Sequence, residues 1–266
     1  MGSSLSQRGG SARDHQARPL DPAQGPGPTG VSNVEQQDAL EKVSFTQQAA
    51  RLTEPFTMID LVQIDDLALS IFLCQGTLPY HRHVDQDELF LVHSGTISLE
   101  NDWNPVILRP GELAVVPKGL RHRSSSLLRS LVLLFQPRLV VNRRNGDRRL
   151  FALKGEGQVE KVSVPAMGRQ ISAAFRPIPL AHMDTYALNL ILSHGAGPWC
   201  STDRQSSLIL CYDGELILDS ELGRVSLLQG ELVVVPKGIT FRLSSSERAL
   251  VLTTERHTQP GLPLLD

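Results

Sequence analysis

Short apolar runs separated by turn residues fill most of the chain from residue 41 onward. In the first half, these runs predict strands over residues 56–64, 67–75, 88–93, 96–100, 112–116 and 131–135. Turn signals stand between them, among them Asp65-Asp66, Ser94-Gly95 and Pro110-Gly111. Many short strands at this spacing favour an all-β sandwich or barrel, with one short helix over residues 45–52.

The second half repeats the first at a constant offset of 119 residues. Three turn residues show the offset: Gly95 recurs as Gly214, Gly111 as Gly230 and Pro117 as Pro236. The segment 112–119 recurs at 231–238 in the same way. No gap is needed between these anchors, so we interpret the chain as a tandem duplication.

Composition and charge limit the kinds of partner. The 266 residues are 41% hydrophobic and 20% charged, with a net charge of −2, which gives no electrostatic basis for binding nucleic acid or an anionic membrane. No apolar run approaches the roughly 20 residues of a membrane span, and the N-terminus lacks the apolar region of a secretory signal. Three cysteines do not make a disulfide framework. We therefore expect a cytoplasmic protein.

The ends of the chain and its middle differ in composition from the apolar runs. Residues 1–40 are rich in Gly, Ser, Pro and Gln, which predicts a disordered tail. Met1 to Ser6 also fit the short N-myristoylation pattern, although a coincidental match is the simpler interpretation. Within residues 138–159, Arg143, Arg144, Arg148 and Arg149 surround Asn145-Gly146, which predicts a basic linker, with an anion site as the alternative. The predicted domains are 41–137 and 160–257, followed by a tail over 258–266.

Histidine and glutamate residues in the first domain have the spacing of a ligand set. His81 and His83 share one face of a strand, because side chains at i and i+2 point the same way. Glu88 begins the next predicted strand, and a turn from Pro117 to Gly119 precedes His122. Three imidazoles and a carboxylate suit a divalent transition metal, and the sequence does not distinguish Fe, Mn, Ni and Zn. His93 lies an odd number of residues from Glu88 and is expected to face away.

These residues resemble the cupin family. His81-x-His83-x4-Glu88-x6-Gly95 fits the first motif of the family, except that the opening Gly76 lies one residue closer to His81 than the pattern asks. The second motif fits from Gly111 through Pro117 and Gly119 to His122, with Ser126 where the family has Asn. The resemblance implies two tandem jelly-roll β-barrels, a bicupin, in which barrel one holds a metal on His81, His83, Glu88 and His122. The first half of the chain also resembles short bacterial cupins labelled mannose-6-phosphate isomerase-like.

Barrel two has none of the four ligands. The offset of 119 residues places Cys200, Thr202, Ser207 and Phe241 at the matching positions. One metal ion per chain is therefore expected. Barrel two is interpreted as a structural half, or as a cavity that binds something without metal.

Two classes of function follow from this site. The first is a metal-dependent enzyme, an oxidoreductase or isomerase, that acts on a small organic substrate in a dioxygenase-like or sugar-phosphate-isomerase-like reaction. No general base can be named, so the catalytic residues stay unassigned. The second class is a non-catalytic sensor or storage module that binds metal or a small ligand. Pairing of the two barrels within one chain is expected, and a homodimer is compatible with the sequence.

Overall fold

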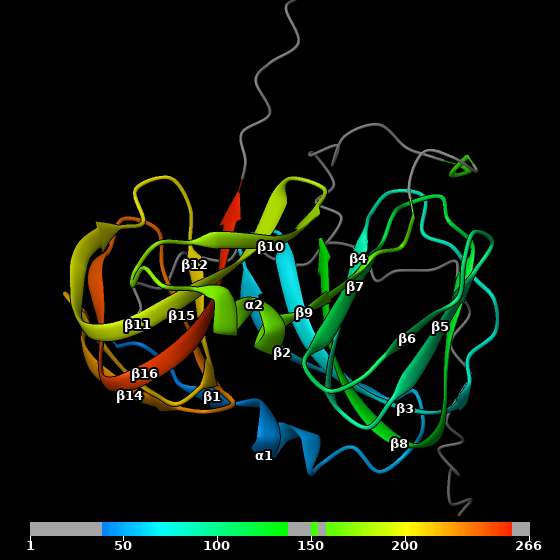
Figure 1. Cartoon of the computed structure of the whole chain (residues 1–266), viewed down its shortest axis with the longest axis horizontal. Coiled ribbons are helices and arrows are strands. Elements are labelled where there is room, and N and C mark those ends of the chain that lie inside the picture. Colours follow the sequence, from blue (N-terminus) through cyan, green and yellow to red (C-terminus); the bar gives the residue numbers. More distant parts are fainter. Residues whose placement is uncertain (1–38, 138–149, 154–157, 257–266) are drawn as a thin grey trace, which may run out of the picture. The chain divides into compact units, whose positions relative to one another are not determined.

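The computed structural model describes residues 39–137, 150–153 and 158–256. The predicted C-terminal tail, residues 1–38 of the predicted N-terminal tail and most of the predicted linker, including its arginines, lie outside these residues. Leu40, at the end of the predicted N-terminal tail, is buried. The described residues form an all-β fold of two eight-stranded antiparallel sheets with two short helices (Figure 1). No helix in the described part of the chain has the length and apolar character needed to cross a membrane.

The first sheet, called barrel one, follows the order β2-β3-β8-β4-β7-β9, and β5 joins β6 to β8. Its strands are β2 (Met58–Ile64), β3 (Leu67–Thr77), β4 (Glu88–Ser94), β5 (Ile97–Asn101), β6 (Val106–Leu108), β7 (Glu112–Val116), β8 (His122–Pro137) and β9 (Lys161–Ser163). The predicted strands of the first half all lie on or overlap these elements. The first half of β8 and all of β6 were not predicted.

The second sheet, called barrel two, has the order β1-β15-β12-β16-β11-β10, and β13 joins β14 to β16. Its strands are β1 (Val43–Ser44), β10 (Ile178–Met183), β11 (Tyr186–Ser201), β12 (Ser207–Asp213), β13 (Glu215–Ser220), β14 (Gly223–Leu228), β15 (Glu231–Val235) and β16 (Thr240–Arg256). The register repeats that of barrel one. Ser70 pairs with Leu134, for example, and Asn189 pairs with Thr253, each 119 residues further on.

The two halves exchange their first strands. Strand β1 pairs with β15 of barrel two, where Val43 faces Leu232. Strand β9, which precedes the strands of the second half, pairs with β7 of barrel one, where Val162 faces Leu113. The exchange covers an edge of each sheet that would otherwise carry unpaired backbone groups. The predicted domain bounds of 41–137 and 160–257 do not allow for this strand exchange, and those bounds stay a prediction.

Each exchanged strand leads into a short helix. Helix α1 (Phe45–Ala49) and helix α2 (Val164–Gln170) are capped by Ser44 and Ser163, whose hydroxyl groups accept from backbone amides of the first turn. Gly111 shows how closely the halves approach there, because a Cβ on it would lie 2.9 Å from the ring of Pro165 in α2. Its φ of +77° also favours glycine.

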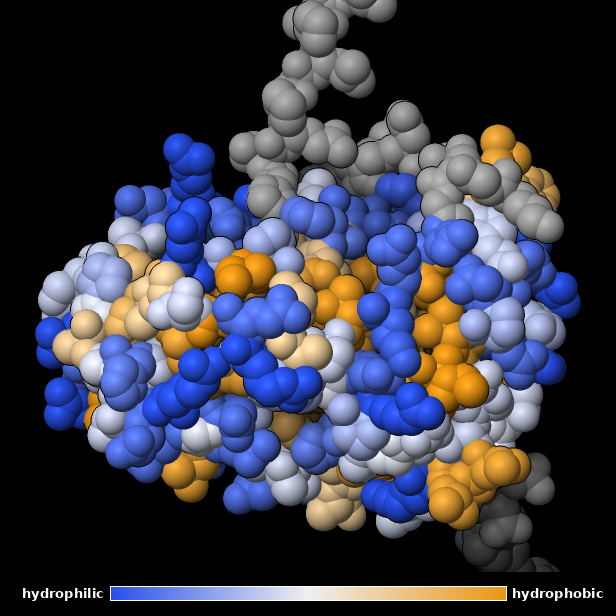
Figure 2. Space-filling model, in the orientation of Figure 1, coloured by the Kyte–Doolittle hydropathy of each residue, from blue (hydrophilic) through white to orange (hydrophobic). Residues whose placement is uncertain are grey.

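One hydrophobic core runs through both barrels. It joins Leu69, Leu91 and Phe135 of barrel one to Leu190 and Leu252 of barrel two, all buried. A separate core fills the rest of each barrel. On the face shown in Figure 2, hydrophobic residues appear in several groups separated by hydrophilic ones. The shared core means that apolar faces of the two sheets pack against each other, as the tandem repeat predicted.

Candidate metal centre

The four side chains that the sequence marks as ligands lie together in barrel one. They are His81, His83, Glu88 and His122, and their donor atoms all lie within 4.8 Å of one another. Glu88 begins β4 and His122 begins β8, while His81 forms an isolated bridge with His122. The structure thus brings together all four predicted residues, and their binding of a metal stays a prediction.

Backbone contacts orient two of the imidazoles. The amide of His81 donates to the carbonyl of His122, and the amide of His122 donates back, each at 2.9 Å. Nδ1 of His81 lies 3.0 Å from the carbonyl of Pro79, and Nδ1 of His122 lies 3.0 Å from that of Leu120. Carbonyl oxygens only accept, so each Nδ1 carries the hydrogen. In the neutral rings, both Nε2 lone pairs are then available to a cation.

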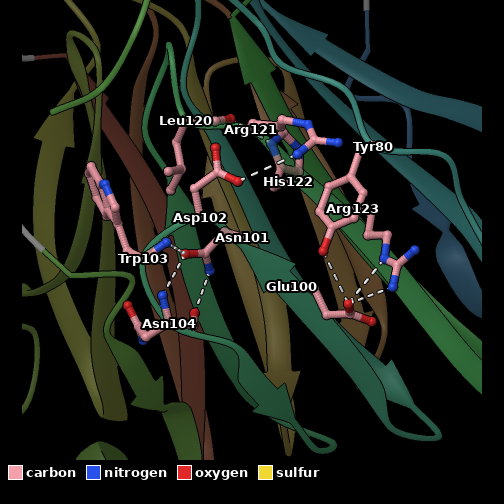
Figure 3. Close-up of polar contacts among 10 residues, drawn as sticks. All are labelled: Tyr80, Glu100, Asn101, Asp102, Trp103, Asn104, Leu120, Arg121, His122 and Arg123. Atoms are coloured by element: carbon pink, nitrogen blue, oxygen red, sulfur yellow. Dashed lines mark hydrogen bonds and ion pairs between the residues drawn. The ribbon is translucent and has the colours of Figure 1, made fainter. Parts of the chain in front are cut away.

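A group of charged and aromatic side chains beside this bridge holds it in register (Figure 3). The guanidinium groups of Arg121 and Arg123 lie 4.2 and 4.4 Å from the ring centre of Tyr80. Glu100 on β5 accepts a hydrogen bond from the hydroxyl of Tyr80 at 3.2 Å and from Nη2 of Arg123 at 2.7 Å. Because Tyr80 adjoins His81 while Arg121 and Arg123 flank His122, these contacts fix both chain segments that carry histidine ligands.

Glu88 leaves one oxygen without a hydrogen-bond partner. Its Oε1 accepts from the side-chain amide of Gln136. Its Oε2 faces Nε2 of His122 at 2.9 Å, and both buried atoms lack a hydrogen-bond partner. Since Nδ1 of His122 holds the hydrogen, two lone pairs would repel there unless a proton or a cation lies between them. The donor set therefore fits a divalent transition ion.

Ionisation of Glu88 and His81 also suits a cation. Burial opposes the charge of Glu88, but the side chains of His122 and His83 prevail and lower its pKa to about 2. Burial lowers the pKa of His81, which keeps that ring neutral at pH 7. A carboxylate and neutral imidazoles are the protonation states in which these side chains bind metals.

Exposure differs across the cluster. Glu88 and His122 are buried, whereas His81 and His83 are half-buried. A cavity of about 190 Å³ adjoins the cluster, and its wall includes His81, His83 and Glu88. The rest of the wall is mostly apolar and includes Phe56, Met58, Phe72, Phe90 and Leu134. A molecule that enters this cavity would meet the two half-buried histidines.

Sequence reasoning missed Gln136 and the aromatic part of the wall. Alternation along the strands could have found them, because residues two apart share a face. Phe90 follows Glu88 by two residues, and Gln136 lies an even number of residues beyond His122 on β8. His93 lies away from the cluster, where its ring packs edge-on against Phe45 at 4.7 Å.

The matching positions of barrel two contain no comparable cluster. Phe241 is buried, Cys200 is an exposed free thiol, and Thr202 bonds the backbone at Pro236 and Ile239. Within the described residues, the barrel-one cluster is the single group of three or more His, Cys, Asp and Glu side chains that could share an ion.

Comparisons with known proteins agree with this architecture. The family profile of the cupin domain matches residues 71–127, which include all four candidate ligands. The uncharacterized protein YdbB of Bacillus subtilis is 27% identical over 84 residues, which cover 31% of this chain and 74% of that protein.

Solved structures match most of the chain. A cupin 2 conserved barrel domain protein from Leptotrichia buccalis superposes with a TM-score of 0.62 at 8% identity, covering 81% of this chain and 96% of that one. A salicylate 1,2-dioxygenase from Pseudaminobacter salicylatoxidans superposes with a TM-score of 0.63 at 11% identity, covering 82% and 85%. A variant of that enzyme in complex with gentisate gives a TM-score of 0.61 at 10% identity, covering 84% and 88%. Likeness at these identities concerns the fold.

Proposed function

Because the chain belongs to the cupin superfamily, we propose that barrel one is the active site of a metal-dependent enzyme that acts on a small organic substrate. The observation that carries the proposal is the unpartnered pair of Glu88 Oε2 and His122 Nε2 inside a cluster of four donors. His81, His83, Glu88 and His122 would hold one divalent transition ion. Such an ion supplies Lewis-acid or redox chemistry.

The protein's own residues would prepare the site in three ways. Gln136 holds Oε1 of Glu88, so that Oε2 points at the imidazoles of His83 and His122. The carbonyls of Pro79 and Leu120 fix the tautomers of His81 and His122. Four protein ligands on an ion that accepts six leave two positions for water or substrate.

The cavity favours a small substrate with an apolar or aromatic part. Its volume of about 190 Å³ is below the roughly 300 Å³ at which pockets for drug-sized ligands begin. Phenylalanine rings at positions 56, 72 and 90 line it. Among the described lining residues none is Arg or Lys, so a phosphate group would find no cationic partner there. A dioxygenase-like reaction is therefore favoured over sugar-phosphate isomerisation, and the structural likeness to salicylate 1,2-dioxygenase supports the same choice.

A second candidate is a module that binds a metal and a small ligand without turnover. Apart from His81, His83 and Glu88, the described residues that line the cavity have no acidic or basic side chain. Catalysis would therefore depend on the ion itself, because no side chain is placed as a general base.

Oxygen uptake separates the two candidates. The full chain is loaded separately with Fe(II), Mn(II), Ni(II) or Zn(II) and mixed with small aromatic compounds, with and without a carboxylate, and with aliphatic keto acids as the comparison. The proposal predicts oxygen consumption and loss of an aromatic compound with at least one redox-active ion, abolished in His83→Ala. Binding of metal and aromatic compound without consumption of either reactant would favour the second candidate.

A further inference from the structure

Barrel two contains a larger cavity at the place that matches the metal centre. Its volume is about 360 Å³, and its wall includes Cys200, Thr202, Ser207 and Phe241, the four residues that replace the ligands. The cavity falls within the range of roughly 300–1,000 Å³ that is typical of small-molecule sites. Loss of the ligands has thus left an open space, where a packed structural half would have none.

The wall of this cavity has become polar where that of barrel one is apolar. Thr253 occupies the position of Leu134, and both residues line their cavities. Glu255 occupies the position of Gln136. Asn189 on β11 pairs with Thr253 on β16 and contributes its amide to the same wall. These changes lie on the inner face, so they alter what the cavity can bind.

Two of these polar residues are buried, yet each leaves one polar atom open to the cavity. The side chains of Thr253 and Asn189 are buried, with 7% and 5% exposure. Within the described residues, the hydroxyl of Thr253 has no hydrogen-bond partner, and Asn189 uses only its amino group, which donates to Glu255 at 3.3 Å. Neither free atom belongs to the buried polar atoms that are closed off from solvent, so each is available to bond a molecule that enters the cavity.

The charges near the cavity cancel. Asp203 and Glu255 are balanced by Arg204 and Arg256, and Arg256 is already paired with Asp66 at 2.8 Å. Apart from these four charged residues, the polar side chains of the wall are neutral, and hydroxyl groups both donate and accept. The buried ring of Phe241 offers an apolar surface beside them. We propose that barrel two binds an uncharged molecule with several hydroxyl groups and an apolar face, of the polyol or monosaccharide class.

The test measures binding of neutral polyols and monosaccharides to the intact chain by calorimetry, with and without metal. The probes are glucose, mannose, myo-inositol and sorbitol, and the charged comparisons are glucuronate and glucosamine. Saturable binding of at least one neutral probe is expected, with charged relatives about tenfold weaker. Thr253→Val, which keeps the shape and removes the hydroxyl, should weaken binding about tenfold, and Asn189→Leu should act similarly.

Two controls test whether the polyol binds in barrel two. His83→Ala should leave polyol binding unchanged, and Thr253→Val should keep the metal content and the melting temperature of the wild type. The proposal is overturned if no neutral probe binds saturably, if the charged relatives bind as tightly, or if His83→Ala abolishes binding while Thr253→Val does not weaken it. Because metal-free protein is included, this result does not depend on whether barrel one is an enzyme.

Discussion

Asp87 of barrel one and Asp184 of barrel two bond each other's backbone amides. The amide of Asp87 donates to Oδ2 of Asp184 at 2.8 Å, and the amide of Asp184 donates to Oδ2 of Asp87 at 2.7 Å. Nζ of Lys118 lies 2.8 Å from Oδ1 of Asp184. The backbone amide of Lys118 donates to Oδ1 of Asp87 at 2.9 Å. Asp87 directly precedes Glu88, and Lys118 belongs to the corner that leads to His122. A turn of barrel two therefore braces both of these segments of barrel one.

Asp184→Ala should weaken metal binding although it lies outside the cluster. The substitution removes the acceptor for the amide of Asp87 and the partner of Lys118, which frees the segments before Glu88 and His122. Loss of such outer contacts typically lowers metal affinity 10- to 100-fold, so we expect roughly a tenfold loss in competition with a chelator. Asp65→Ala is the matched control, because Asp65 bonds Ser206 of barrel two at 2.9 Å. Equal losses in both variants would contradict this role.

Gln136→Leu should also lower metal affinity by roughly tenfold or more, because Oε1 of Glu88 would lose its donor and the carboxylate could rotate away from the imidazoles. Chelator competition measures the loss, and circular dichroism checks that the protein stays folded. Glu255→Gln alters the matching position of barrel two and should leave metal affinity unchanged. If Gln136→Leu binds metal as tightly as the wild type, Gln136 does not position Glu88.

Asp66 links the barrels in a way that depends on pH. Burial opposes its charge, but the hydroxyl of Tyr186 and the guanidinium of Arg256 prevail and lower the pKa of Asp66 below 3.8. The unfolded chain therefore binds this proton at a higher pH than the folded chain, and the contribution of Asp66 is present above pH 3.8 and lost as the pH falls through the folded pKa. Asp66→Asn should reduce the free energy of unfolding by about 1–3 kcal/mol at pH 7.

Urea unfolding of the wild type and Asp66→Asn at pH 7, 5 and 3 checks this sign. The difference between the two proteins should stay constant from pH 7 to 5 and shrink towards pH 3. A difference that grows as the pH falls would mean that Asp66 is protonated in the folded protein.

The ligand set and the repeat could be predicted because they depend on local spacing. Turn glycines and prolines keep the offset of 119 residues, and His81, His83, Glu88 and His122 stand at fixed distances from them. The first half of β8 was missed because it is rich in serine. Ser126 and Ser130 are nonetheless buried, since their hydroxyl groups bond the carbonyl of Thr96 at 2.7 and 3.2 Å. A search for apolar runs does not find a strand whose buried side chains are satisfied in this way.

The strand exchange and the barrel-two cavity could not be read from local patterns. Val43 and Ser44 form a strand of two residues, too short for any periodicity, and their partners Leu232 and Glu231 are far along the chain. The polar cavity depends on which face of β16 points inward. Thr253 looks like any other threonine in a strand until its neighbours Asn189 and Phe241 are known.

The metal content of the intact chain tests the central claim most directly. The full chain is reconstituted with excess Fe(II), Mn(II), Ni(II) or Zn(II), freed of unbound ions and analysed for metal and protein. We predict one tightly bound ion per chain for at least one metal, lost in a folded His122→Ala variant and retained when the matching residue is changed in Phe241→Ala. Two ions per chain, no bound ion with any metal, or full retention by His122→Ala would contradict a single metal centre in barrel one.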